Sequence, residues 1–375
     1  MLDEMRELKK NLMEFKEYIS DKQILCFGAG LRGHAFVDIL ENWNMYMKLA
    51  AFIDNDSQKQ GKTIVINNQL YSIISLDEVS EYLSSNIATV TVIACSDVIG
   101  VKKQLDNCPE LNWRPCFSLA EVASQQLLAS DYDSVRRDEN DILIPKKIHY
   151  AWFGGNKTDS VKKNIEKWHK MCPDYEIIEW NEDNYDIEKN TYMKEAYQRK
   201  QWGFVSDYLR LDVIYQYGGI YLDTDVEIVK SPDELLYQHG FLISDCSFFV
   251  NLGSGFGAAP QEPLIKEMLD YYNNVHFIRR DGSLNRMSCI GHQYRVLKNH
   301  GFQVNDSIQT IQGIHIYPMI MSSTNYYTLQ RRESDKAFFA HYGNGSWLTV
   351  EYVENRQELQ KEDRDGRLIN YHLNK

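Results

Sequence analysis

Apolar positions recur at two spacings along this chain, and the spacing separates expected helices from expected strands. Up to Ile19 they fall three or four positions apart, with charges of both signs between them, which predicts an amphipathic helix over residues 1–20. One interpretation is that its apolar face packs against the domain that follows. The alternative is docking to a membrane, which the lack of a net positive face disfavours.

A strand, a glycine-rich turn, a helical pattern and a second strand come next. The strand 23–27 leads into Gly28, Gly30 and Gly33, and the second strand ends at Asp54. This order is typical of a Rossmann βαβ unit, in which glycines let the backbone approach a pyrophosphate and an acid roughly twenty residues on binds a ribose hydroxyl. We therefore expect a Rossmann-like domain over residues 21–128, with these four residues as candidates for binding a nucleotide. The alternative is a turn kept for helix–sheet packing in a scaffold or sensor domain.

A polar, charge-rich run over residues 129–142 has the composition of a linker. After it the chain restarts with an apolar strand that runs into the glycine turn at Gly154 and Gly155. We expect a second domain over residues 143–350 and a charged tail over residues 351–375.

Composition narrows the class of protein. A chain of 375 residues can hold two domains with cores of their own, and a net charge of -12 argues against broad binding to nucleic acid or anionic lipid. The seven cysteines lack paired C-x-x-C spacing, so neither a disulfide framework nor a zinc site is indicated. With no apolar run near the ~20 residues of a membrane helix and no signal-peptide pattern, we expect a cytoplasmic protein. An acceptor at the inner membrane face would make it peripheral.

The strongest chemical signal is a short apolar strand that follows Gly218-Gly219 and ends in Asp223-Thr224-Asp225. In an extended segment alternate side chains point the same way, so the two carboxylates would lie about 7 Å apart along the backbone and could share one hard divalent cation. That ion would bridge the phosphates of a nucleotide-sugar and neutralise the departing diphosphate. Without a cation the carboxylates would raise each other's pKa. Solvated loop acids are the alternative.

Asp207 and Arg210 form a second candidate group. They lie three positions apart on an expected helix that Ser206 could cap, so they share one face and can act together. The alternative is a salt bridge on the protein surface.

These motifs, in this order, resemble glycosyltransferase family 32, the DXD-containing sugar transferases that include capsular polysaccharide enzymes and fungal mannosyltransferases. The resemblance is carried by Ile144–Gly154, Ser206-Asp207-x-x-Arg210, Gly218–Asp225 and His341-x-x-x-x-Ser346-Trp347. It implies an α/β protein in which the Rossmann-like domain precedes a nucleotide-diphospho-sugar transferase domain of the GT-A type.

The resemblance also implies roles for single residues. Trp152 would stack on the nucleotide base, Asp207 would hold sugar hydroxyls, and Arg210 would approach the sugar and diphosphate. Asp223 and Asp225 would bind the metal together with His341, whose imidazole would favour Mn²⁺ over Mg²⁺. Ser346 and Trp347 would lie on a flap that closes over the diphosphate. A core tryptophan and a structural histidine are the alternatives for Trp152 and His341.

Two further segments bear on the acceptor side. In the family, the small-residue run Gly253–Pro260 helps to build it, and a tight loop without a ligand is the alternative. Gly291-His292-Gln293 stands where relatives often carry Gly-Pro, which departs from the pattern. The sequence assigns no carboxylate as a covalent nucleophile, and Asp245, near the acceptor segment, is only a candidate.

The resulting expectation is a metal-dependent, retaining glycosyltransferase that moves a sugar from a UDP-sugar to a hydroxyl of a glycan or lipid-linked glycan in surface polysaccharide synthesis. Two alternatives stay open. One is an NAD-type oxidoreductase or epimerase acting through the N-terminal domain. The other is a catalytically silent sugar-binding assembly protein.

Overall fold

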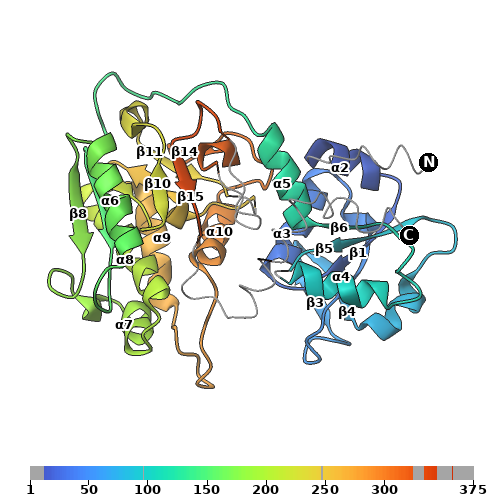
Figure 1. Ribbon diagram of the computed structural model, residues 1–375. Helices are drawn as coiled ribbons and strands as arrows, with labels where there is room; N and C mark the ends of the chain where they lie inside the picture. Colours follow the sequence, from blue (N-terminus) through green and yellow to red (C-terminus); the bar gives the residue numbers. More distant parts are fainter. Residues whose placement is uncertain (1–11, 96, 246–247, 324–332, 344–356, 358–375) are drawn as a thin grey trace. The chain divides into compact units, whose positions relative to one another are not determined.

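The computed structural model describes residues 12–95, 97–245, 248–323, 333–343 and 357. They belong to two compact units, and the chain passes from the first to the second between Ala129 and Ser130 (Figure 1). The expectations for residues 1–11, for Ser346 and Trp347, and for the tail other than residue 357 lie outside the described residues.

The first unit is built on a six-stranded sheet of order β3-β4-β2-β1-β5-β6. Its strands are β1 (Gln23–Phe27), β2 (Leu49–Ile53), β3 (Thr63–Ile66), β4 (Gln69–Ile74), β5 (Thr89–Ile93) and β6 (Cys116–Ser118). All neighbours pair in parallel except β3, which pairs antiparallel with β4. Every residue of β5 is buried, as expected for a strand inside a parallel sheet.

Helices separate the strands of this unit except between β2, β3 and β4, which follow one another directly. The helices are α2 (Leu12–Ile19), α3 (Leu31–Asn42), α4 (Val98–Asp106), α5 (Leu119–Ala129) and the short 3₁₀ helices η1 (Tyr46–Lys48) and η2 (Leu76–Tyr82). Helix α2 is the described part of the amphipathic N-terminal segment. Its apolar residues Leu12, Phe15 and Ile19 are buried, and the Phe15 ring lies 5.7 Å from that of Phe117, so this face packs within the first unit.

The second unit contains a seven-stranded mixed sheet of order β13-β14-β11-β12-β9-β7-β8 and a two-stranded sheet of β10 and β15. The strands are β7 (Lys147–Ala151), β8 (Glu176–Trp180), β9 (Gly219–Tyr221), β10 (Val226–Ile228), β11 (Gly240–Ile243), β12 (Phe256–Ala258), β13 (Gln309–Ile311), β14 (Ile314–Tyr317) and β15 (Phe339–His341). Strands β8, β7 and β9 pair in parallel, whereas β12 pairs antiparallel with both β9 and β11.

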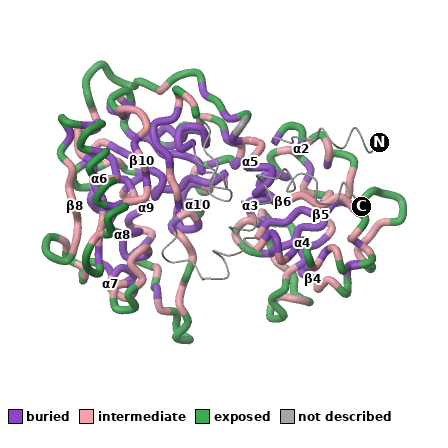
Figure 2. The backbone as a smooth tube through the Cα atoms, in the orientation of Figure 1, coloured by how far each residue is buried: buried purple, intermediate pink, exposed green. Residues whose placement is uncertain are grey.

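Helices pack against these strands, with α8 against β7 and β9 and α6 against β10 (Figure 1). The α-helices are α6 (Asp159–Met171), α7 (Thr191–Gln198), α8 (Trp202–Tyr217), α9 (Pro263–Tyr271) and α10 (Cys289–Asn299). The 3₁₀ helices are η3 (Ile187–Lys189), η4 (Pro232–Tyr237), η5 (Leu252–Ser254), η6 (Tyr272–Asn274) and η7 (Met319–Met321). In Figure 2 most residues of α6 are exposed, whereas residues in the interior of the unit are buried.

The polar run that follows Ala129 has no helix or strand, yet it is held on the second unit. Tyr132 is buried, and its hydroxyl donates to the carbonyl oxygen of Lys336 at 2.7 Å. The backbone N–H of Arg136 donates to the Tyr317 hydroxyl at 2.7 Å. These contacts tie the run to β14 and to the segment before β15, which come much later in the sequence.

The double glycine makes the crossing from α8 into β9 possible. Gly218 and Gly219 have φ values of 62° and 106°, a region that favours glycine. A Cβ on Gly219 would lie 2.8 Å from the carbonyl oxygen of Lys147, which is closer than carbon and oxygen can approach. The two glycines therefore let β9 follow directly on α8 and lie close against β7.

Two further expectations concern the cysteines and membrane-spanning helices. The described cysteines, Cys26, Cys95, Cys108, Cys116, Cys172 and Cys289, are free thiols. Among the described residues, no helix combines the length and the apolar character needed to cross a bilayer.

Candidate active site

The paired carboxylates lie in a turn and not in a strand. Strand β9 ends at Tyr221 and β10 begins at Val226, so Asp223-Thr224-Asp225 forms the connection between them. The N–H of Val226 donates to the carbonyl oxygen of Asp223 at 3.0 Å, which closes the turn. The expectation of an extended segment with alternating side chains was therefore wrong. The turn itself brings the two carboxylates to one side.

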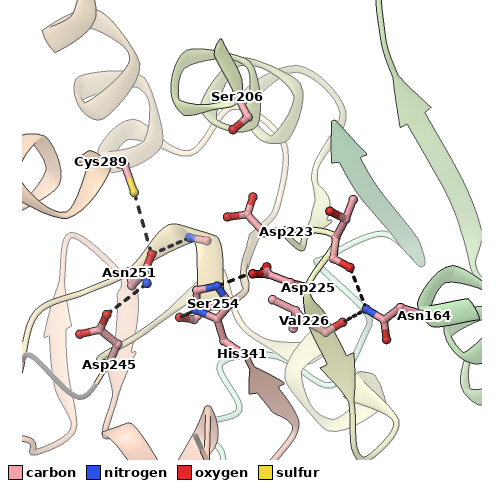
Figure 3. Close-up of polar contacts among 12 residues, drawn as sticks. Asn164, Ser206, Asp223, Asp225, Val226, Asp245, Asn251, Ser254, Cys289 and His341 are labelled. Atoms are coloured by element: carbon pink, nitrogen blue, oxygen red, sulfur yellow. Dashed lines mark hydrogen bonds and ion pairs between the residues drawn. The ribbon is translucent and has the colours of Figure 1, made fainter. Parts of the chain in front are cut away.

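A side chain from α6 braces this turn (Figure 3). The amide of Asn164 donates to the carbonyl oxygens of Thr224 and Val226 at 3.0 and 2.7 Å. Because these bonds link the turn to a helix of the same unit, they limit the movement of the two carboxylates.

His341 joins the pair through strand pairing. Strands β10 and β15 are antiparallel, with Val226 opposite His341. This register places His341 Nε2 3.4 Å from Asp225 Oδ1 (Figure 3). One ligand atom from each of Asp223, Asp225 and His341 lies within 4.8 Å of the others, and all three residues are partly buried. We call these residues the triad.

Arg210 connects α8 to the triad. Its Nη2 lies 3.3 Å from Asp223 Oδ1 and 3.3 Å from Asp207 Oδ1. It also donates from Nη2 to the Ser206 hydroxyl at 2.9 Å and from Nε to the Ser206 carbonyl oxygen at 3.2 Å. The guanidinium is thus held in one orientation.

One expectation about this helix needs correction, and one alternative is excluded. Ser206 does not cap it, because α8 begins at Trp202 and the Ser206 hydroxyl donates to the carbonyl oxygen of Gly203 at 2.8 Å. The Asp207–Arg210 pair is not on the surface, since the two residues are only 3% and 2% exposed. Removal of either partner of such a buried ion pair would leave the other charge buried without a partner.

Burial dominates the electrostatics of these groups. Loss of water raises the pKa of Asp207 to about 7, although the neighbouring Arg210 charge acts in the opposite direction. The same loss raises the pKa of Asp223, again against Arg210, and the Asp225 charge adds to the rise. Burial alone would lower the pKa of His341, but Asp225 and Asp223 outweigh it and raise that pKa. A cation between these groups would relieve the repulsion of the carboxylates.

The loop Asn251–Ser254 adds residues that the sequence did not assign to this site. Gly253 lies against the Asp223 carboxylate, and Ser254 Oγ is 2.9 Å from His341 Nδ1. Asn251 donates to the buried carboxylate of Asp245 at 3.1 Å (Figure 3). The only signal in the sequence was the small-residue run from Gly253, which was assigned to the acceptor side.

Trp152 comes immediately after β7. Its indole Nε1–H donates to the carbonyl oxygen of Gly155 at 2.7 Å, and its backbone N–H donates to the carbonyl oxygen of Trp180 at 2.9 Å. The side chain is partly buried and packs against the core of the second unit. One part of the ring is therefore held by the protein while the rest is open to solvent.

Two polar residues of α10 that broke the family pattern are buried. His292 and Gln293 are 2% and 1% exposed. Burial lowers the pKa of His292 to about 4, so its imidazole is neutral near pH 7. Cys289, one turn earlier, donates to Asn251 Oδ1 at 3.9 Å, which links this helix to the loop beside the triad.

In the first unit the glycine turn is tightly packed. A Cβ on Gly33 would lie 2.1 Å from the carbonyl oxygen of Gly28, and Gly28 has a φ of 112°, whereas a Cβ on Gly30 would meet nothing within 4 Å. Asp54 Oδ2 accepts from the N–H of Ala29 at 2.9 Å and from Lys59 Nζ at 2.9 Å. The carboxylate proposed to bind a ribose is thus bonded to its own chain, and these bonds, against the effect of burial, lower its pKa.

Comparisons with known proteins point to the same part of the chain. Residues 158–242 match the family model described as a glycosyltransferase sugar-binding region containing a DXD motif. That span contains Asp207, Arg210, Asp223 and Asp225, and it leaves out both Trp152 and His341.

The curated relatives match over short segments. Inositol phosphoceramide mannosyltransferase 1 of Schizosaccharomyces pombe is 24% identical over 150 residues, which cover 36% of this chain and 46% of the relative. Subversion of eukaryotic traffic protein A of Legionella pneumophila is 28% identical over 132 residues, which cover 28% of this chain and 20% of the relative. The matches thus span less than half of either relative.

One solved structure, the PaToxG glycosyltransferase, aligns over 58% of this chain and 86% of its own, with 16% identity and a TM-score of 0.33, which carries no argument about the fold. The family model and the curated relatives place a glycosyltransferase region in this chain, and the enzyme class they support is a transferase.

Proposed function

We propose that this chain is a metal-dependent, retaining glycosyltransferase that moves a sugar from a nucleotide-diphosphate donor, a UDP-sugar, to a hydroxyl of a glycan or lipid-linked glycan. The observation that carries the proposal is the triad, whose ligand atoms lie within 4.8 Å of one another beside the Arg210 guanidinium. A carboxylate pair, an imidazole and a fixed cation together suit a metal-bound diphosphate.

The triad fits a divalent cation. Carboxylate oxygens suit both Mg²⁺ and Mn²⁺, and the His341 nitrogen favours Mn²⁺. Asp223, Asp225 and His341 would hold the ion, which would supply Lewis-acid stabilisation of the negative charge on the diphosphate.

The other side chains position the donor. Arg210, fixed by Ser206 and next to Asp223, would bind an oxygen of the diphosphate, and Asp207 would accept hydrogen bonds from hydroxyls of the sugar. Trp152 would offer its open ring face to the uracil base. Such preorganised groups lower the barrier without having to reorganise during the reaction.

We propose a front-face course for the transfer. The bond from the anomeric carbon to the diphosphate oxygen breaks as the bond from the same carbon to the acceptor oxygen forms. The acceptor proton passes to a phosphate oxygen of the departing nucleoside diphosphate, so no separate base is needed. Asp245 accepts a hydrogen bond from the Asn251 amide at 3.1 Å, and no step of this course requires it as a nucleophile.

Several finer features belong to the same proposal. We take the second unit to be a GT-A type domain and the first to be a Rossmann-like domain whose glycine turn serves packing. The acceptor would belong to surface polysaccharide synthesis, such as a capsule. The enzyme would act in the cytoplasm at the inner membrane face. The mannosyltransferase names of the fungal relatives make GDP-mannose the donor to compare with UDP-sugars.

The test is donor hydrolysis across a panel of UDP- and GDP-sugars with Mn²⁺, Mg²⁺ or a chelator. Cleavage of one donor that needs metal and is lost in Asp223→Ala and Asp225→Ala would support the proposal. Absence of cleavage with every donor, together with unchanged donor binding in both variants, would refute it. Binding without turnover would favour the silent assembly protein, and a nicotinamide absorbance in the purified chain would favour the oxidoreductase.

A further inference from the structure

The loop Asn251–Ser254 contacts two of the three residues of the triad. Gly253 is in contact with Asp223: the Asp223 N–H donates to the Gly253 carbonyl oxygen at 3.3 Å, and a Cβ on Gly253 would lie 2.4 Å from Asp223 Oδ2. The backbone of Gly253 is outside the left-handed region, so alanine could adopt its conformation. The missing side chain at this position therefore serves to leave room for a carboxylate.

Ser254 contacts the imidazole of the triad. Its hydroxyl lies 2.9 Å from His341 Nδ1, while His341 Nε2 faces Asp225 Oδ1 at 3.4 Å. In the tautomer with the proton on Nδ1, the Nδ1–H donates a hydrogen bond to the Ser254 hydroxyl oxygen, and the lone pair of Nε2 points toward the two aspartates. Metal-binding histidines are commonly fixed in this way, by a hydrogen bond from the ring nitrogen that does not touch the metal.

Asn251 holds the loop in this conformation (Figure 3). Its Oδ1 accepts from the Gly253 N–H at 2.9 Å, its carbonyl oxygen accepts from the Ser254 N–H at 3.0 Å, and its amide donates to Asp245 at 3.1 Å. The residue is only 5% exposed, so water cannot readily replace these bonds. One buried asparagine thus determines where Gly253 and Ser254 lie.

We infer that Asn251, Gly253 and Ser254 are positioning residues that set the affinity of the triad for its divalent cation. Gly253 admits the Asp223 carboxylate, Ser254 fixes the tautomer and ring orientation of His341, and Asn251 keeps both in place. The inference rests on the proposed function, since it concerns the same cation.

The experiment is titration of the full chain with Mn²⁺ in the absence of donor. Binding is measured by calorimetry and by the electron paramagnetic resonance signal of free Mn²⁺. The variants are Gly253→Ala, Ser254→Ala and Asn251→Ala. The matched control is Asn190→Ala, because Asn190 is also 5% exposed and bonds to Met193 and Tyr272, away from the triad. Thermal unfolding of each metal-free protein reports folding.

We expect the Mn²⁺ Kd to rise about 10- to 100-fold in Ser254→Ala, the range seen when the partner of a metal-binding histidine is removed. Gly253→Ala should raise the Kd at least about 10-fold, because its methyl group displaces a ligand carboxylate. Asn190→Ala should keep the wild-type Kd even where it lowers the melting temperature. Gly253→Ala and Ser254→Ala should melt close to wild type.

The outcomes separate this inference from the proposed function. A wild-type chain that binds no Mn²⁺ in the absence of donor would refute this inference, whereas metal-dependent donor hydrolysis by the same chain would still support the proposed function. Wild-type Mn²⁺ affinity in Gly253→Ala and Ser254→Ala, with binding lost in Asp223→Ala, would refute the role of the loop and leave the metal site intact. A Kd that rises equally in Asn190→Ala would also refute it, since the effect would then follow general destabilisation.

Discussion

His341 Nε2 lies 3.4 Å from Asp225 Oδ1. The contact arises because β15, which carries His341, pairs with β10, which begins directly after Asp225. The same pairing gives a second bond, from the N–H of Tyr342 to the carbonyl oxygen of Asp225 at 3.1 Å. An imidazole nitrogen is thereby placed beside two carboxylates that are close neighbours in the sequence. Under the proposed function, the metal preference of the site would depend on this contact.

Replacing His341 with asparagine should change which metal supports activity. An amide oxygen suits Mg²⁺, whereas the imidazole nitrogen favours Mn²⁺, so the ratio of donor hydrolysis in Mn²⁺ to that in Mg²⁺ should fall about 10-fold. The control is His239→Asn, which removes a histidine paired with Glu262 outside the triad. An unchanged ratio in His341→Asn would show that His341 is not a ligand.

Replacing Arg210 with lysine should not preserve activity. The guanidinium bonds at once to Ser206 and Asp223, and a single ammonium nitrogen cannot reproduce that geometry. We expect kcat for donor hydrolysis to fall about 100-fold, as when one preorganised donor is lost from an active site. The exposed Arg295→Lys serves as the control. A kcat within a few-fold of wild type in Arg210→Lys would contradict the assigned role.

Replacing Trp152 with alanine should weaken donor binding more than it slows the reaction. Stacking of a base on an aromatic ring contributes about 1–3 kcal/mol, which corresponds to a KM for the donor roughly 10-fold higher or more, with kcat little changed. Trp152→Phe should retain most of the affinity. Trp113→Ala, at a tryptophan that is 68% exposed in the first unit, is the control. If kcat falls and KM does not change, Trp152 is not the base platform.

The second unit should lose stability in mild acid through His149. Trp180 Nε1–H donates to His149 Nδ1 at 3.0 Å, so the imidazole accepts there, and its Nε2 donates to the Gly218 carbonyl oxygen at 2.9 Å. Burial lowers the pKa of His149 to about 4 from a usual 6.5. The neutral form is therefore favoured by folding, and the unfolded chain binds the proton first as the pH falls.

The direction of the stability change follows from the difference between the folded and unfolded pKa values of His149. The stabilisation is fully present above pH 6.5 and is lost between pH 6.5 and about 4, with an upper limit of about 3 kcal/mol. Hydrogen exchange of the β7 amides, measured without metal, should show a smaller loss between these pH values in His149→Gln than in wild type. The exposed His169→Gln should behave like wild type. Parallel losses in all three proteins would exclude His149 as the cause.

The local parts of the site could be predicted from the sequence because they depend on neighbours along the chain. Asp207 and Arg210 lie one helical turn apart and so share a face of α8, and Asp223 and Asp225 are close enough along the chain for the turn to bring them together. The strand–turn–helix order around Gly28 could be predicted for the same reason. The backbone conformation of Asp223–Asp225 was harder to predict, since a two-residue spacing suits both a strand and the turn that is present.

Tertiary structure decided what those pairs face. Nothing near Arg210 in the sequence indicates that its guanidinium lies 3.3 Å from Asp223, because that contact requires α8 to fold back and pack against β9. The approach of His341 requires β10 to pair with β15, and the position of Ser254 requires a loop that Asn251 holds. Spacing along the chain therefore determined which residues carry the chemistry, whereas strand pairing and close packing, which act between distant segments, decided how they form one site.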